Sequence, residues 1–239
     1  MHLTDPKRNA YLCEQLDICK QLFASYQQAQ QDHQSKAELF AKQQQAADDA
    51  EQKAKTLRGK ARALLREMMG QPSKQMQDLR SEERAAYSEA EDYRTFLAEL
   101  ELDRDEAALA MLDIGRDYVE KRQYALQVYT AGLLDQASQL EPLLKALAMH
   151  EDGLLREGQF ATWRQLGFES AQAAALSEFN TQLTRRLSSY QYDHHADSVH
   201  QVVPWAHGLE EARGLSLCKY NKQKAAFAER RQALEAANQ

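Results

Sequence analysis

The chain has 239 residues, of which 43% are hydrophobic and 28% are charged, and its formal net charge is -6 at pH 7. This acidic balance argues against a general nucleic-acid binder, because such proteins gain most of their affinity from basic residues on phosphates. No apolar run has transmembrane length, and the first residues lack the apolar stretch of a signal peptide. We therefore expect a cytoplasmic protein that binds neither membranes nor nucleic acid.

The composition predicts long helices. Ala, Gln, Glu, Leu and Arg dominate the sequence, whereas only nine glycines and four prolines interrupt it. No strand-like alternation and no repeat of roughly 20–50 residues is present. We therefore predict an all-α fold. Because alanine supplies much of the apolar content, we expect a thin seam between helices and an elongated molecule.

The first predicted helix begins at Asp5-Pro6, a good start because the carboxylate can accept a backbone N–H and proline suits the first turn. It runs to about Met69. The stretch Gly70-Gln71-Pro72-Ser73 is the clearest break in the sequence. Glycine can end the first helix in the left-handed conformation, proline blocks its continuation, and serine can cap the next helix. A tight helical hairpin follows from this pattern.

The second predicted helix has apolar residues at a sustained spacing of three and four, as in a coiled-coil seam. Its seam comprises Met76, Leu79, Ala86, Ala90, Tyr93, Leu97, Leu100, Ala107, Met111, Ile114, Tyr118 and Ala125. Gly115 and Gly132 interrupt the pattern, which indicates close packing or a bend at those positions. The helix should end before Pro142, because the residue before a proline is disfavoured in the α region. Residues 1–141 are thus predicted to form one long, antiparallel, coiled-coil-like helical hairpin.

Residues 142–239 are predicted to form a smaller helical C-terminal region. The pattern predicts helices near 142–150, 154–166, 169–187 and 209–237, with a loop near 188–208. That loop is expected because serines, Pro204, Gly208 and four of the seven histidines concentrate there.

The histidine-rich loop is the one arrangement that suggests chemistry. It offers nitrogen and oxygen ligands from His194, His195, His200, His207, Asp193 and Asp197. Their spacing matches neither a metal-binding helix nor a zinc finger, so we interpret them as surface histidines and predict no metal. Gly-rich phosphate loops and nucleophile motifs are absent from the sequence, so we expect no cofactor and no enzyme activity.

The sequence suggests partner-binding residues of two kinds. Aromatic side chains are favoured at protein interfaces, and this places Tyr124, Tyr129 and the loop residue Trp205 among the candidates. The last helix is basic, with six Lys or Arg against four Glu in residues 209–239, whereas residues 78–106 hold eleven Asp or Glu against four Arg. Lys219, Lys222 and Lys224 are therefore candidates for contact with an acidic protein surface.

The second helix resembles the size-determination (Sid) proteins of satellite phages. The matching run comprises Glu91-Asp92-Tyr93-Arg94, Phe96-Leu97, the stretch from Leu100 through Tyr118, then Lys121 and Tyr129, and it ends near Lys145-Ala146-Leu147-Ala148-Met149-His150.

The resemblance implies an external scaffold. Proteins of that family assemble outside a helper phage's procapsid and force the major capsid protein into a smaller icosahedral shell. For this chain it implies the major capsid protein as partner, self-association into a cage through two-fold and three-fold contacts, and a location on procapsids in the cytoplasm of a bacterial host.

Three alternatives remain open from the sequence. A capsid-decoration or polarity-suppression protein is suggested by Trp163-x-x-Leu166-Gly167-Phe168 before a helix. A cytosolic coiled-coil adaptor unrelated to viruses would explain the same seam. An enzyme would depend on the histidine loop alone.

Overall fold

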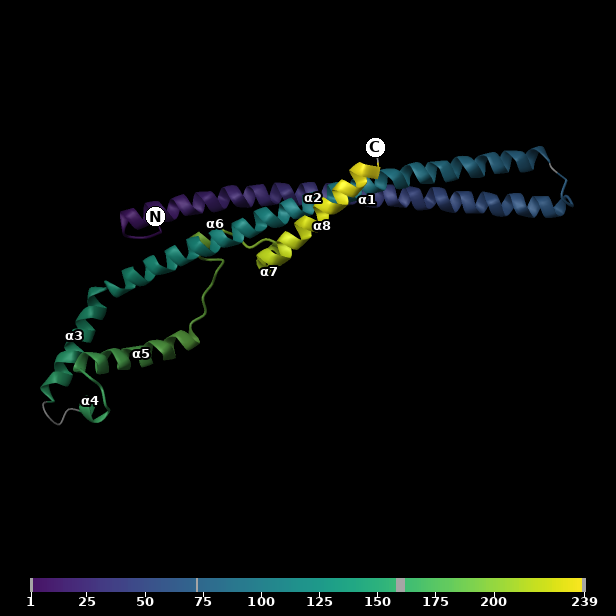
Figure 1. Ribbon diagram of the computed structural model, residues 1–239. Coiled ribbons are helices and arrows are strands. Elements are labelled where there is room, and N and C mark those ends of the chain that lie inside the picture. Colours follow the sequence, from purple (N-terminus) through teal and green to yellow (C-terminus); the bar gives the residue numbers. More distant parts are fainter. Residues whose placement is uncertain (1, 72, 158–161, 238–239) are drawn as a thin grey trace. The chain divides into compact units, whose positions relative to one another are not determined.

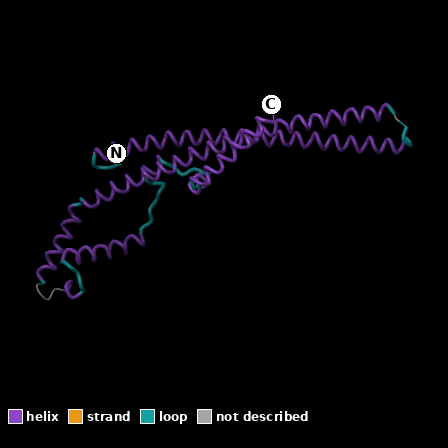
Figure 2. The backbone as a smooth tube through the Cα atoms, viewed as in Figure 1, coloured by secondary structure: helices purple, strands orange, loops and turns teal. Residues whose placement is uncertain are grey.

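The computed structural model describes residues 2–71, 73–157 and 162–237, and all regular structure within those ranges is helical (Figures 1 and 2). A long antiparallel hairpin of two helices is followed by smaller helices, which confirms the predicted fold class. The helices are α1 (Pro6–Glu67), α2 (Lys74–Ser138), α3 (Glu141–Arg156), α4 (Thr162–Gln165), α5 (Ala171–Ser189), α6 (Ser198–Val202), α7 (Leu209–Gly214) and α8 (Leu217–Ala237).

The chain packs as two compact units, to which α1 and α2 both contribute. The first unit combines residues 1–20 with 120–205, and the second combines residues 21–119 with 206–239. The predicted domain boundary between residues 141 and 142, with a helical hairpin before it and a smaller helical region after it, stays a prediction. In the described ranges, no helix is both long enough and apolar enough to cross a membrane.

In the second unit, α1 and α2 pack along a narrow seam of small side chains. Ala54, Leu57 and Ala86 are buried in one cluster, and further along the hairpin the rings of Phe23 and Tyr118 lie 5.2 Å apart. A seam this thin lets the two helices approach closely, as its alanine content predicts.

The turn between α1 and α2 has the predicted chemistry. Gly70 adopts a φ of 85° and its N–H donates to the carbonyl of Leu65, so α1 ends in a left-handed cap. Met69 shares the positive φ, at 49°. The hydroxyl of Ser73 accepts from the N–H of Met76 at 3.2 Å, which caps α2. Pro72 lies outside the described residues.

The prediction of one helix over residues 209–237 is wrong, because this segment forms two helices. α7 ends at Gly214, and α8 begins at Leu217. The hydroxyl of Ser216 accepts from the N–H of Lys219 at 3.3 Å, so serine caps a new helix and does not continue the old one. Tyr220 and Phe227 of α8 are buried within the second unit, with 7% and 9% of their surface exposed.

In the first unit, the start of α1 packs with the end of α2, and Leu3, Leu12 and Leu16 are buried. α2 ends before Pro142, as predicted, and proline stands in the first turn of α3.

Two expectations for the next segment are wrong. The predicted break between residues 150 and 154 does not occur, because α3 runs without interruption through Gly153. The predicted helix near 154–166 is replaced by the end of α3 and the short α4, and its residues 158–161 lie outside the described part. Trp163 in α4 packs with Ala171 and Ala174 of α5 into a small core.

Candidate interaction surfaces

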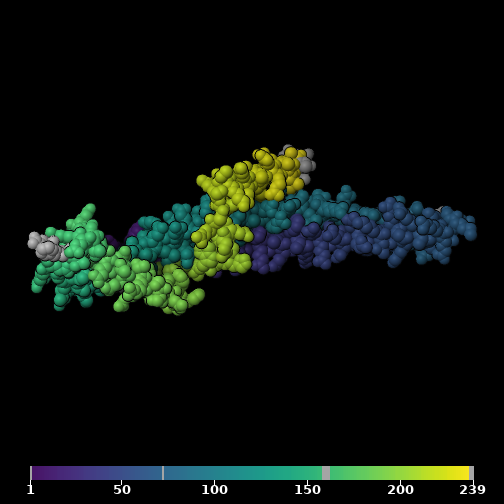
Figure 3. Space-filling view, turned by 90° about the horizontal axis from the view of Figure 1, so that it is seen from below, coloured from purple at the N-terminus to yellow at the C-terminus, as the bar shows by residue number. Residues whose placement is uncertain are grey.

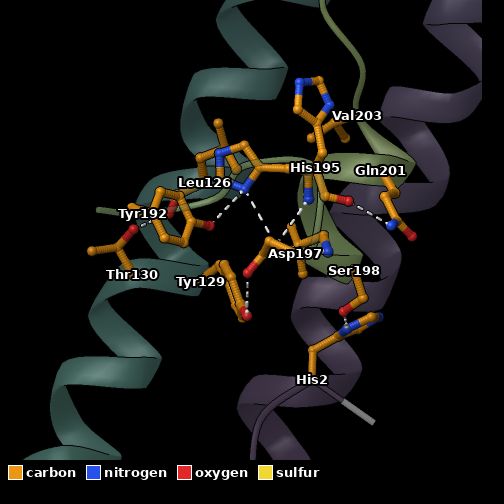
Figure 4. Close-up of polar contacts among 12 residues, drawn as sticks. His2, Leu126, Tyr129, Thr130, Tyr192, His195, Asp197, Ser198, Gln201 and Val203 are labelled. Carbon is orange, nitrogen blue, oxygen red and sulfur yellow. Dashed lines mark hydrogen bonds and ion pairs between the residues drawn. The ribbon is translucent and has the colours of Figure 1, made fainter. Parts of the chain in front are cut away.

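Asp197 organises the segment that was expected to be a plain loop. Its Oδ1 accepts from the backbone N–H groups of Val199 and His200, at 2.9 and 3.0 Å, and so caps the short helix α6. Its Oδ2 accepts from the hydroxyl of Tyr129 on α2 at 3.1 Å (Figure 4). The expectation of a loop throughout 188–208 is therefore wrong at α6, where one carboxylate caps a helical turn and contacts α2.

The contacts of Asp197 stabilise its charged form. Partial burial would raise the pKa of this carboxyl, but the hydrogen bonds from His200 and Tyr129 outweigh it and lower the pKa to about 2. Burial and the negative charge of Asp197 raise the pKa of Tyr192 to about 12. At neutral pH, this cluster therefore holds a fixed negative charge among neutral phenols.

The histidines are divided between two environments. The rings of His194 and His200 lie beside Tyr192 and are tilted by 57° to each other, with their centroids 5.1 Å apart, and the backbone N–H of His195 donates to Asp193. His207 contributes its backbone carbonyl, which accepts from the hydroxyl of Tyr26 at 3.2 Å. Within the described residues, no three His, Cys, Asp or Glu side chains converge as metal ligands would.

The candidate aromatic residues have neighbours within the first unit. The hydroxyls of Tyr124 and Tyr11 lie 2.8 Å apart, and both rings are more than 40% exposed. Trp205 is also exposed, and the guanidinium of Arg122 lies 5.3 Å from its ring centroid. Arg122 also donates to the carbonyl of Val203 at 2.8 Å. Sequence reasoning missed Arg122, since only folding brings it to residues 203–205.

The candidate lysines lie on the exposed surface of α8. Lys219, Lys222 and Lys224 form no ion pair with any described residue. The arginines further along the same helix are engaged: Arg230 binds Asp105 at 2.7 Å, and Arg231 binds Glu106 at 3.3 Å. The amino end of α8 therefore leaves its positive charge exposed, while arginines of its carboxyl half bind acidic residues of α2.

An open groove between α3 and α5 was also missed by sequence reasoning. Leu143, Leu147, Phe179 and Leu183 are among its lining residues, and so are His150 and Glu178, whose Nε2 and Oε2 atoms lie within hydrogen-bond distance at 2.8 Å. The amphipathic spacing of α3 was visible in the sequence, but the partner helix that forms the other wall was not.

These features define the class of the protein as an all-α protein built on a long helical hairpin. A scan against family models and a search of curated proteins both find no match for the chain.

The particular fold is that of a size determination (Sid) protein. Among solved structures, the chain matches one described as the satellite phage P4 procapsid including size determination (Sid) protein. The TM-score is 0.64 at 17% sequence identity, and the match covers 92% of this chain and 99% of that chain. The resemblance inferred from the second helix is thus confirmed at the level of the fold.

Proposed function

We propose that this chain is an external scaffolding protein of a phage satellite, which binds the outside of helper-phage procapsids and redirects their assembly to a smaller icosahedral capsid. The proposal rests on one observation, the fold shared with the Sid protein over nearly the whole length of both chains. The partners are then the major capsid protein of the helper and further copies of this chain, in the host cytoplasm. The proposal includes no catalytic step, cofactor or metal.

The physical features of the chain suit this role. The two long helices supply stiffness, because every backbone group within a helix is bonded along the helix axis. Exposed lysines on α8 and exposed tyrosines in the first unit supply contacts of modest strength. Modest contacts suffice on a closed shell, because many copies act together and multivalency multiplies their effect.

Helper infection tests this function in cells. The chain is expressed in a host that supports a tailed helper phage, and the yield of infectious helper and the length of packaged DNA are measured. We expect fewer infectious helper particles and shorter packaged DNA, because a smaller shell cannot hold the full helper genome. Unchanged yield and DNA length, in cells where the chain is shown to accumulate on helper procapsids, would contradict the proposal.

A further inference from the structure

Four arginines gather around a hollow near the turn of the hairpin in the second unit. Arg58 and Arg62 come from α1, and Arg80 and Arg84 come from α2. The hollow measures about 350 Å³, and Glu83 is the one acidic residue among its lining residues. Each helix contributes its two arginines one turn apart, so both pairs lie on a single face of the hairpin.

The positive charge in this hollow is largely uncompensated. Glu83 lies 3.6 Å from Arg58, measured from Oε1 to Nε. Arg62, Arg80 and Arg84 form no hydrogen bond or ion pair with any residue of the described ranges. Like charges held close together destabilise a folded chain unless a ligand offsets them. The packing of the hairpin does not explain why these arginines are held together, because its seam is built from small apolar side chains.

The arrangement fits the chemistry of carboxylate recognition. A guanidinium presents a planar fork of donors that can bind both oxygens of a carboxylate at once. The remaining lining residues, Ala61 and Leu65, are apolar, and Ala61 is only 5% exposed. The side chains of Arg58, Arg62 and Arg84 are exposed, and on the face drawn in Figure 3 no other segment lies over the hairpin near its turn. A short acidic segment can therefore enter from solvent.

We propose that this hollow is a binding site for a partner-protein segment that carries two or more carboxylates. Nucleic acid fits less well, since it needs a continuous basic track and residues 78–106 are strongly acidic. The site can be tested independently of the scaffolding function, because its detection requires only the purified chain and a peptide.

The test uses the purified full-length chain and a fluorescein-labelled hexaglutamate peptide, followed by fluorescence anisotropy at low and near-physiological ionic strength. Arg62→Gln, Arg80→Gln and Arg84→Gln are combined in one variant. Lys7→Gln, Lys42→Gln and Lys53→Gln together are the control of equal charge, since all three lysines are exposed on α1. We expect the arginine variant to bind at least about tenfold more weakly and the control to bind like the parent chain.

Two further measurements separate binding from folding. Glu83→Gln should tighten peptide binding, because it releases Arg58 and removes the one carboxylate of the lining. The arginine variant should unfold at a temperature no lower than the parent chain, because it relieves repulsion. A lower unfolding temperature would show that the arginines support the hairpin and would overturn the proposal.

Other outcomes would also overturn it. Equal loss in the arginine variant and the lysine control would mean nonspecific charge attraction. Tighter binding of a single-stranded oligonucleotide through the same arginines would assign the hollow to nucleic acid. Salt-sensitive self-association of the parent chain that the arginine variant loses would assign it to a second copy of this chain.

Discussion

The hydroxyl of Tyr129 on α2 donates to Oδ2 of Asp197, the residue that caps α6, across 3.1 Å. The same carboxylate accepts two backbone N–H groups through its other oxygen. One side chain therefore both starts a helix and attaches it to α2 within the first unit. The role of Tyr129 as a partner contact stays a prediction, but its hydroxyl already donates to Asp197 within the chain.

Removing either partner should destabilise the first unit. We expect Tyr129→Phe to lower the free energy of unfolding by about 1 kcal/mol, the usual net value of a hydrogen bond. Asp197→Ala should lower it by roughly 1–3 kcal/mol, because the helix cap is lost as well. Urea unfolding followed by circular dichroism, run as a double-mutant cycle, measures the coupling. Strictly additive effects would show that the two side chains do not interact.

Acid should remove the contribution of Asp197. The folded-state pKa, about 2, lies below the unfolded value of about 3.9, so the stabilisation is fully present above pH 4 and is lost as pH falls towards 2. The pKa difference corresponds to roughly 2–3 kcal/mol. The gap in unfolding free energy between the parent chain and Asp197→Asn should shrink over this range. Asp103→Asn, at an exposed position, is the control and should show no such change. A gap that stays constant down to pH 2 would contradict the assignment.

Two glycines inside helices should respond oppositely to alanine. A Cβ at Gly115 would lie 3.1 Å from the Cβ of Ala212 and from the ring of Tyr26, which is 1% exposed. We expect Gly115→Ala to destabilise the chain by roughly 1–2 kcal/mol through overpacking. A Cβ at Gly59 would meet nothing within 4 Å, so Gly59→Ala should stabilise by about 0.5–1 kcal/mol. Thermal unfolding of both variants checks this, and the same sign for both would disprove the packing argument.

Apolar contacts should hold α8 more strongly than its ion pairs do. Phe227 is 9% exposed, whereas Arg230 and Arg231 have side chains about half exposed in their pairs with Asp105 and Glu106. We expect Phe227→Ala to cost roughly 3 kcal/mol and Arg230→Ala less than about 1 kcal/mol. Protection of α8 amides in hydrogen exchange measures both, and the reverse order would mean that charge holds the helix.

Reversing charge at the start of α8 should weaken attachment to a shell without unfolding the chain. Lys219→Glu, Lys222→Glu and Lys224→Glu replace exposed lysines that pair with no described residue, so the fold should persist. Co-sedimentation with helper procapsids measures the loss, which we expect to be at least about tenfold in affinity. Lys7→Glu, Lys42→Glu and Lys53→Glu together are the control for net charge, since these three lysines are also exposed. Equal loss in both variants would remove α8 from the contact surface.

The hairpin was predictable because its signals are local. Gly70 ends α1, Ser73 caps α2, and the burial of Ala86 and Tyr118 follows from their spacing along one helix face.

The features that sequence reasoning missed depend on contacts between distant segments or on weak local signals. Asp197 caps α6 through local backbone N–H groups, but the attachment of α6 to α2 depends on Tyr129, 68 residues away along the chain. The arginine hollow requires two helices to be placed side by side. The split between α7 and α8 depends on Ser216, which caps α8. The amphipathic pattern continues across Ser216 and masks this weak capping signal in the sequence.

The most direct test of the account is the size of the shells that form in the presence of this chain. The major capsid and internal scaffold proteins of a tailed helper phage are co-expressed with and without it, and particle diameters are measured by negative-stain electron microscopy. We predict uniformly smaller shells that carry the chain on their outer surface. Shells of normal diameter that lack the chain, with a helper shown to support the satellite, would contradict the scaffolding function and favour a coiled-coil adaptor.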